Sequence, residues 1–271
     1  VMRGGPSTGI PTKSEQVDLN IALNGLHGDA PHLVLGALDH ADCILTTEWA
    51  VRLAEALQTV AIVLTDQLLA QSTVLISEPV YELPEISGRV VAEPVENYQR
   101  YAITENGVSP MAIPGNASST YVADGLEHCE SGKPSTAAAD HLAQLDKRSR
   151  KIENFDYGGH WADVRGEGDV AILTWGSTTA VVREAAKRLE AQGFTLKVIA
   201  LRLLLPASPD KLESELEGVK KVLIVEQSHS GQFHRYLRAY YDIAADTHVL
   251  ARPGPLPITP AEIVGQFENW S

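Results

Sequence analysis

The chain has 271 residues, 44% of them hydrophobic and 21% charged, which is typical of a globular protein and long enough for two domains. Its net charge of −13 argues against nucleic acid as a partner, and no apolar run approaches the ~20 residues of a membrane span. Cys43 and Cys129 lie far apart and outside any C-x-x-C pattern, so we expect a reducing cytoplasm and no iron–sulfur cluster held by this chain alone.

The chain begins with the stretch VMRGGPSTGIPTKSEQ, in which glycines alternate with polar side chains of different kinds. Arg3 offers a planar donor fork for a carboxylate or phosphate. Around it stand hydroxyl donors and glycines that let backbone N–H groups approach an anion: Ser7, Thr8, Thr12, Gly4, Gly5 and Gly9. The pattern predicts an oxyanion-binding turn. A phosphate-binding P-loop is excluded, because Ile10 and Pro11 stand where that motif requires Lys and Ser or Thr.

The next segment predicts a strand, a helix and a second strand. The strands are expected from His32 to Ala37 and from Val60 to Asp66, and the helix between them is capped near Asp39. Continuous apolar strands in this order favour parallel pairing with both sheet faces covered. We therefore interpret residues 1–88 as part of an α/β domain whose first strands lie upstream.

Residues 89–165 lose this periodicity and carry turn-forming residues. A structureless connection of this length predicts an interdomain linker with a functional loop. The charged run LDKRSRKIENFD near its end predicts a helix that faces either solvent or a partner.

Regular structure resumes in residues 166–252, which predict a three-layer α/β domain. The strands are expected at 170–175, 196–201, 221–227 and 247–251, and the helices at 178–193, 209–217 and 233–241. In the tail 253–271, Thr259 caps a helix with Glu262 as its capping-box partner.

Eight segments follow one another along the chain: RGGPSTGIPTKSEQ, GLHGDAP, VAIVLTDQLLAQS, RYAITENGVSPMAIPG, GLEHCESG, KRSRK, GDVAILTWGST and VLIVEQSHSGQF. Together they resemble the alpha subunit of 2-oxoacid:ferredoxin oxidoreductases, especially the 2-oxoglutarate type. The resemblance implies that 1–88 is the C-terminal part of a pyrimidine-type thiamine diphosphate domain with a parallel sheet. It also implies that 89–165 is a linker with an active-site loop, and that 166–252 is a transketolase C-terminal-like domain.

The resemblance further implies the reaction. 2-Oxoglutarate is oxidatively decarboxylated with coenzyme A as co-substrate, giving succinyl-CoA, CO₂ and reduced ferredoxin, and the reaction is reversible. A beta subunit holds or shares thiamine diphosphate and Mg²⁺ and carries a 4Fe-4S cluster. The expected assembly is a dimer of heterodimers that ferredoxin meets through the complex.

The family's pyrimidine domain begins with a Tyr-Pro-Ile-Thr-Pro segment and a glutamate that activates the cofactor ring. The present chain starts with Val1 and has LPITPAEI only after the second domain, so Glu262 receives no catalytic role. We therefore expect an upstream segment of the same subunit to complete the site.

Site residues are carried over one by one from the resemblance. Arg3 is the expected catalytic residue that binds the 2-oxoacid carboxylate, within a substrate-binding turn that includes Gly4, Gly5 and Ser7. The other two expected catalytic residues, Thr8 and Thr12, hydrogen-bond substrate or cofactor, or else satisfy backbone groups of the turn.

A second group of candidates lies outside this turn. Glu127 and His128 belong to an active-site loop, 118–132, that we expect to act as a lid, and Cys129 stands where relatives commonly have Asp. His27 is a weaker candidate, and no spacing predicts a metal site. The EQSHSGQF segment either contributes a ligand loop or packs an interface through Gln232 and Phe233.

Two other functions stay open at this point. One is the same chemistry on pyruvate or a branched 2-oxoacid. The other is an assembly module without catalytic residues, which the complete RGGPST motif disfavours.

Overall fold

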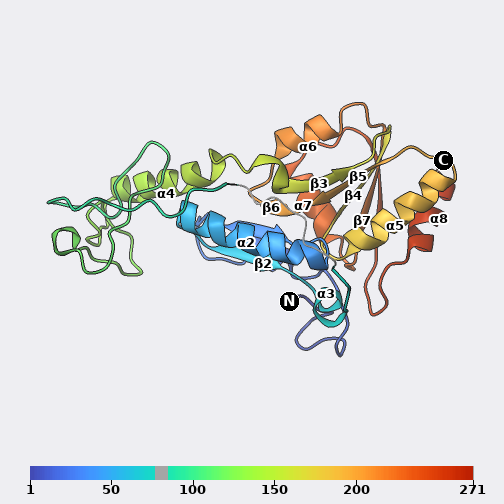
Figure 1. The fold of residues 1–271 in the computed structure, drawn as a ribbon, viewed down its shortest axis with the longest axis horizontal. Helices are drawn as coiled ribbons and strands as arrows, with labels where there is room; N and C mark the ends of the chain where they lie inside the picture. The colour runs from blue at the N-terminus through green and yellow to red at the C-terminus, as the bar shows by residue number, and fades with distance from the viewer. Residues whose placement is uncertain (77–84, 271) are drawn as a thin grey trace.

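The computed structural model describes residues 1–76 and 85–270. Its strands form two sheets, which lie beside each other in Figure 1. One has three strands in the order β2-β1-β6, and the other has five in the order β3-β5-β4-β7-β8. An arm built from helix α4 (Ala138–Glu153) and irregular loops extends away from both sheets, at the left of Figure 1.

The three-stranded sheet confirms the predicted parallel pair. Strand β1 (Leu33–Gly36) pairs in parallel with β2 (Ala61–Leu64), and helix α2 (His40–Leu57) connects them. The Asp39 side chain accepts a hydrogen bond of 2.9 Å from the backbone N–H of Asp42, which confirms the expected cap. The short helices α1 (Leu19–Asn24) and α3 (Gln67–Gln71) flank this unit.

The third strand of this sheet comes from the other half of the chain. Strand β6 (Leu203–Leu205) runs antiparallel to β1, although the sequence placed these residues within the C-terminal unit. Leu203 and Leu204 are fully buried, so the apolar run that ends β5 continues into the neighbouring sheet. The C-terminal half therefore covers the edge of the N-terminal sheet.

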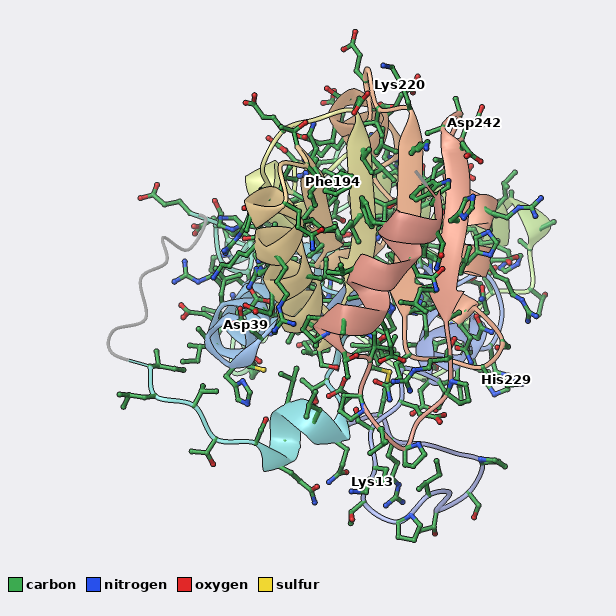
Figure 2. All side chains as sticks on the ribbon, turned by 90° about the vertical axis from the view of Figure 1, so that its right-hand side faces the viewer. Lys13, Asp39, Phe194, Lys220, His229 and Asp242 are labelled. Carbon is green, nitrogen blue, oxygen red and sulfur yellow. The ribbon has the colours of Figure 1, made fainter. Side chains whose placement is uncertain are left out.

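The five-stranded sheet confirms the expected three layers. Its strands are β3 (Ala162–Arg165), β4 (Val170–Trp175), β5 (Lys197–Leu201), β7 (Lys221–Glu226) and β8 (Asp246–Ala251). Helices α5 (Thr178–Ala191) and α8 (Pro260–Trp270) pack on one face, which is turned toward the viewer in Figure 2. Helices α6 (Pro209–Glu215) and α7 (Gln232–Tyr240) join the core on the other face. Strand β3, which the sequence assigned to the linker, pairs antiparallel with β5 at the sheet edge.

The arm contains the charged run of the sequence. Helix α4 begins at Ala138, ahead of that run, and buries Lys147 and Ile152. The sequence predicted a helix that faces either solvent or a partner. In the structure, part of the basic face of α4 points into the protein, so neither prediction describes the helix fully. Within 1–76 and 85–270, no helix combines the length and apolar composition needed to cross a bilayer.

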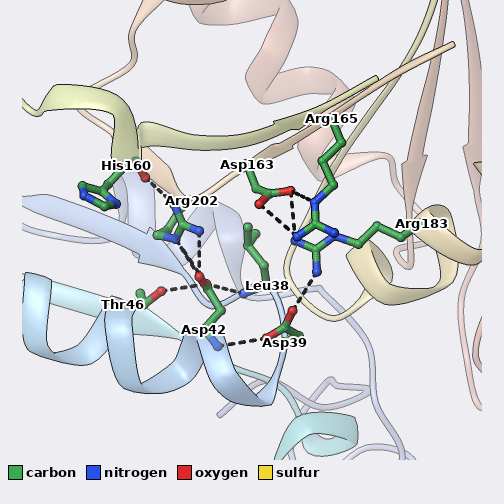
Figure 3. A network of polar contacts seen from close by, with 9 residues as sticks. All are labelled: Leu38, Asp39, Asp42, Thr46, His160, Asp163, Arg165, Arg183 and Arg202. Carbon is green, nitrogen blue, oxygen red and sulfur yellow. Dashed lines mark hydrogen bonds and ion pairs between the residues drawn. The ribbon is translucent and has the colours of Figure 1, made fainter. Parts of the chain in front are cut away.

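A buried polar network joins the two halves (Figure 3). The guanidinium of Arg202, between β5 and β6, donates to Asp42 of α2 at 2.7 and 2.9 Å, and both side chains are less than 10% exposed. Arg183 of α5 bridges Asp39 at 2.7 Å and Asp163 at 3.0 Å. These charges come from elements distant in sequence, so the network fixes how the two halves sit together.

Candidate functional site

The glycine-rich turn is attached to the carboxyl end of β2. The Met2 N–H donates to the Thr65 carbonyl at 2.7 Å, and the Gln67 N–H donates to the Met2 carbonyl at 2.9 Å. Met2 itself is 2% exposed. Met2 is therefore fixed at the carboxyl end of the sheet, where open α/β sheets place ligand loops, and Arg3 is the next residue.

Two hydrogen bonds close the turn, which projects below the sheets around Lys13 in Figure 2. Gly4 N–H donates to the Lys13 carbonyl at 3.0 Å, and Ile10 N–H donates to the Gly4 carbonyl at 2.7 Å. Gly9 has φ +62°, and a Cβ there would lie 1.5 Å from the Gly4 carbonyl oxygen. The Gly4 amide thus shapes the turn and is not free for an anion, and only glycine fits position 9.

Gly9→Ala is expected to open this turn, because its methyl group would overlap the Gly4 carbonyl. The turn lies at the surface, so we expect a change in melting temperature of only a few degrees and a loss of anion binding at the turn of about tenfold or more. Calorimetry and titration with a carboxylate anion measure both effects. Gly88→Ala is the matched control, since a Cβ there meets nothing within 4 Å. Equal anion affinity in the two variants would contradict this role of the turn.

The polar side chains of the turn face outward. Arg3, Ser7, Thr8 and Thr12 are exposed. Within the described residues, no hydrogen bond or ion pair engages the Arg3 guanidinium or the hydroxyls of Thr8 and Thr12. The turn thus presents a donor fork and two hydroxyl groups that are free to bind a ligand.

The residues after the turn are locked to the C-terminal unit through Gln16. Gln16 is 1% exposed, and its side chain donates to the Trp175 carbonyl at 2.7 Å. The side-chain Oε1 of Gln16 accepts from the Gln227 backbone N–H at 2.8 Å. The backbone N–H of Gln16 donates to the Gln227 carbonyl at 2.8 Å. Sequence reasoning missed this residue because its partners lie more than 150 positions away.

The EQSHSGQF segment packs this interface. Gln232 donates to the Val17 carbonyl at 2.7 Å and accepts from the Asn20 N–H at 3.0 Å. The fully buried Glu226 carboxylate accepts from the N–H groups of Phe233 and His234 at 2.9 and 2.8 Å, which fixes the start of α7. Of the two interpretations of this segment, the structure agrees with the interface.

Asp66 lies at the base of the turn, where it forms an isolated parallel bridge with Met2. It is 1% exposed, caps α3 by accepting from Leu69 N–H at 3.1 Å, and accepts a hydrogen bond from the Ser177 hydroxyl. Sequence reasoning missed this contact as well. The only local signal was an acidic residue directly after the β2 strand.

Glu127 and His128 lie in the arm, which Figure 1 shows well away from the N-terminal turn beside α3. Burial raises the pKa of Glu127, but hydrogen bonds from Arg148 at 2.7 and 3.2 Å and the contact with His141 at 2.7 Å outweigh burial and lower it to about 2. The His128 ring stacks on Tyr101 with 3.6 Å between centroids. His27 is exposed. Within this chain, the structure does not bring these residues to Arg3.

Comparison with known families identifies both units. Residues 1–147 match the pyruvate flavodoxin/ferredoxin oxidoreductase, thiamine diphosphate-binding family, and residues 159–235 match the transketolase C-terminal domain. These matches agree with the fold expected from the sequence, a thiamine diphosphate-type domain followed by a transketolase-like one.

Individual relatives agree with these family matches. The 2-oxoacid:ferredoxin oxidoreductase 2 subunit alpha of Aeropyrum pernix is 36% identical over 99% of this chain and 42% of its own length. The 2-oxoglutarate oxidoreductase subunit KorA of Mycobacterium tuberculosis is 33% identical over 92% of this chain and 39% of its own length. The chain thus spans less than half the length of either relative.

A solved structure matches throughout. The 2-oxoglutarate:ferredoxin oxidoreductase from Magnetococcus marinus, with 2-oxoglutarate, coenzyme A and succinyl-CoA bound, has a TM-score of 0.86 and 38% identity. The match covers 99% of this chain and 47% of that one. The expected family is confirmed: the chain belongs to the alpha subunits of the 2-oxoacid:ferredoxin oxidoreductases.

Proposed function

We propose that the chain is an alpha-subunit component of an enzyme that oxidatively decarboxylates 2-oxoglutarate. The products are succinyl-CoA, CO₂ and reduced ferredoxin, and coenzyme A is the co-substrate. The observation that carries the proposal is the Arg3 guanidinium, exposed and unpaired among the described residues on a turn fixed at both ends. Relatives named for 2-oxoglutarate favour this substrate over pyruvate or a branched 2-oxoacid.

In this proposal the turn positions the substrate. Arg3 pairs with the carboxylate next to the keto group through two parallel hydrogen bonds, which orients the carbonyl carbon. Thr8 and Thr12 donate to oxygen atoms of the substrate or cofactor. Gly4, Gly5 and Ser7 shape the backbone around the bound molecule. Thiamine diphosphate, when bound, supplies the carbanion that attacks a keto carbon and the electron sink for decarboxylation.

In this proposal a beta subunit shares or holds thiamine diphosphate and Mg²⁺. The beta subunit also carries the 4Fe-4S cluster. An upstream segment of the alpha subunit completes the site, and the working unit is a cytoplasmic dimer of heterodimers that ferredoxin meets through the complex.

In this assembly we propose that Glu127 and His128 act at the site of a neighbouring alpha subunit. The arm that holds them extends away from the turn of their own chain. The loop then closes over that site and excludes water.

Ferredoxin reduction by the purified alpha–beta complex tests the proposal. We expect reduction with 2-oxoglutarate that requires both coenzyme A and thiamine diphosphate, and a much lower kcat/KM with pyruvate and with a branched 2-oxoacid. A higher kcat/KM with either of those acids would assign the chain to that substrate instead. No reduction with any of them, from a complex that carries its cluster and cofactor, would favour the assembly module.

A further inference from the structure

A basic cavity lies where the arm meets the N-terminal unit, separate from the N-terminal turn. It has a volume of about 330 Å³, is partly open to solvent, and is lined by residues 26–32, the end of α2, the loop around 100–109 and α4. Four cationic side chains and two imidazoles line it: Arg100, Lys147, Arg148, Lys151, His32 and His128. Four cations around one small cavity are unexpected in a chain with a net charge of −13.

Three of these cations have only neutral hydrogen-bond partners within the described residues. Lys147, 7% exposed, donates to the Ser109 hydroxyl. Lys151 donates to the Gln58 carbonyl at 2.9 Å, and Arg100 donates to the Gln58 side-chain oxygen at 2.7 Å. Arg148 is the exception, since it is paired with Glu127. The cavity therefore carries uncompensated positive charge.

This arrangement opposes folding when the cavity is empty. Burial, together with the positive charges of neighbouring residues, lowers the pKa of both Lys147 and Lys151 to about 8. Among the described residues, Glu130 is the acid that raises the pKa of Lys147, and its carboxylate already accepts a hydrogen bond of 2.8 Å from the Ile103 N–H. Buried like charges are retained in proteins when an opposite charge compensates them.

His128 adds a further unused polar atom. Its Nδ1 is buried and has no hydrogen-bond partner among the described atoms, and the side chain is 7% exposed. Stacking on Tyr101 holds the ring in the cavity wall. A buried ring nitrogen without a partner costs free energy unless a ligand or water satisfies it.

A second cavity adjoins the first, and none of the described residues in its wall is Lys or Arg. It has a volume of about 600 Å³ and shares Leu26, Ala30, Pro31 and His32 with the basic cavity. Its wall combines apolar side chains such as Leu23 and Ile152 with the carboxylates Asp29 and Glu153. A ligand can therefore place a phosphate group among the cations and an uncharged organic part in the adjoining space.

We propose that the basic cavity binds the phosphate or diphosphate group of a small phosphorylated molecule. The volume suits a small anion, and several converging cations match the multiple charges of phosphate groups. A carboxylate side chain from a neighbouring subunit is the competing occupant. It brings a single negative charge, which compensates fewer of the four lining cations than a phosphate or diphosphate does. The proposal does not rest on the turn around Arg3, which belongs to a different part of the fold.

Isothermal titration of the assembled complex tests the proposal, with inorganic phosphate, inorganic diphosphate and ADP as probes. The complex is first saturated with thiamine diphosphate, so that its cofactor site is filled. We expect saturable binding of diphosphate that Lys147→Met and Lys151→Gln each weaken about tenfold. Binding that is tighter for ADP than for diphosphate would place an organic group in the adjoining cavity. Equal or weaker binding of ADP would indicate free phosphate or diphosphate as the ligand.

Lys187→Met is the matched control, because it removes the same charge from an exposed position of α5. It is expected to leave diphosphate affinity unchanged. The Lys147→Met variant is expected to melt no lower than the unmodified complex, since the substitution removes a buried charge. Should it fail to fold, the less buried Lys151→Gln decides. No saturable binding, equal weakening by Lys187→Met, or a structure of the complex with a partner carboxylate in the cavity would overturn the proposal.

Discussion

Arg3→Lys is expected to lower kcat/KM for 2-oxoglutarate by about 10- to 100-fold in the assembled complex. Lysine keeps the positive charge but loses the planar fork that pairs with a carboxylate through two hydrogen bonds. Hydrogen bonds to charged groups contribute about 1.5–3 kcal/mol, which corresponds to that range of rates. Steady-state kinetics with varied 2-oxoglutarate measure the effect, and a rise in KM would indicate that substrate binding itself is weakened.

The comparison needs a variant that makes the same chemical change elsewhere. Arg188→Lys is suitable, because Arg188 lies on the exposed face of α5, where it pairs with Glu184. We expect its kinetics to match those of the unmodified complex. If Arg3→Lys behaves like Arg188→Lys, the turn does not hold the substrate carboxylate.

Asp42→Asn is expected to destabilise the chain by about 3–5 kcal/mol, since it leaves the Arg202 guanidinium buried without its counter-charge. The two side chains are 7% and 9% exposed, and the same carboxylate also accepts from the Thr46 hydroxyl at 2.8 Å and the Leu38 N–H at 2.9 Å (Figure 3). Denaturant unfolding of the complex measures the loss.

Glu184→Gln provides the control for this prediction. It breaks a pair of the same charge type on a helix surface, where both side chains are about half exposed. Such exposed pairs contribute about 0.3–0.5 kcal/mol. A loss no larger for Asp42→Asn than for Glu184→Gln would show that the network does not hold the two halves together.

Local sequence signals predicted much of the fold correctly. The cap at Asp39 was confirmed, and so was the capping box in which the Thr259 N–H donates to Glu262 at 2.7 Å. Helix α5 ends at Ala191, close to the predicted end at 193, and Gly193 with φ +95° follows its C-cap. These features depend on a few neighbouring residues, so their signal lies within a short stretch of sequence.

Contacts between distant segments gave no such signal. The run LRLLLP has the composition of one continuous strand, yet Arg202 turns the chain between β5 and β6, and the two strands join different sheets. Nothing in the sequence around Gln16 indicates that its side chain hydrogen-bonds to the backbone of Trp175 and Gln227. The basic residues of α4 predicted a solvated or partner-facing helix, because nothing local indicates that Arg100 shares a cavity with them.

A structure of the assembled complex with 2-oxoglutarate bound tests most directly whether Arg3 holds the substrate carboxylate. The quantity to measure is the distance from the Arg3 guanidinium nitrogens to the oxygens of the carboxylate beside the keto group. We expect two hydrogen bonds of about 2.7–2.9 Å, with the turn closed at Gly4 and Gly9 as in the present structure. A substrate whose carboxylate is held by other residues, with Arg3 still directed into solvent, would contradict this expectation.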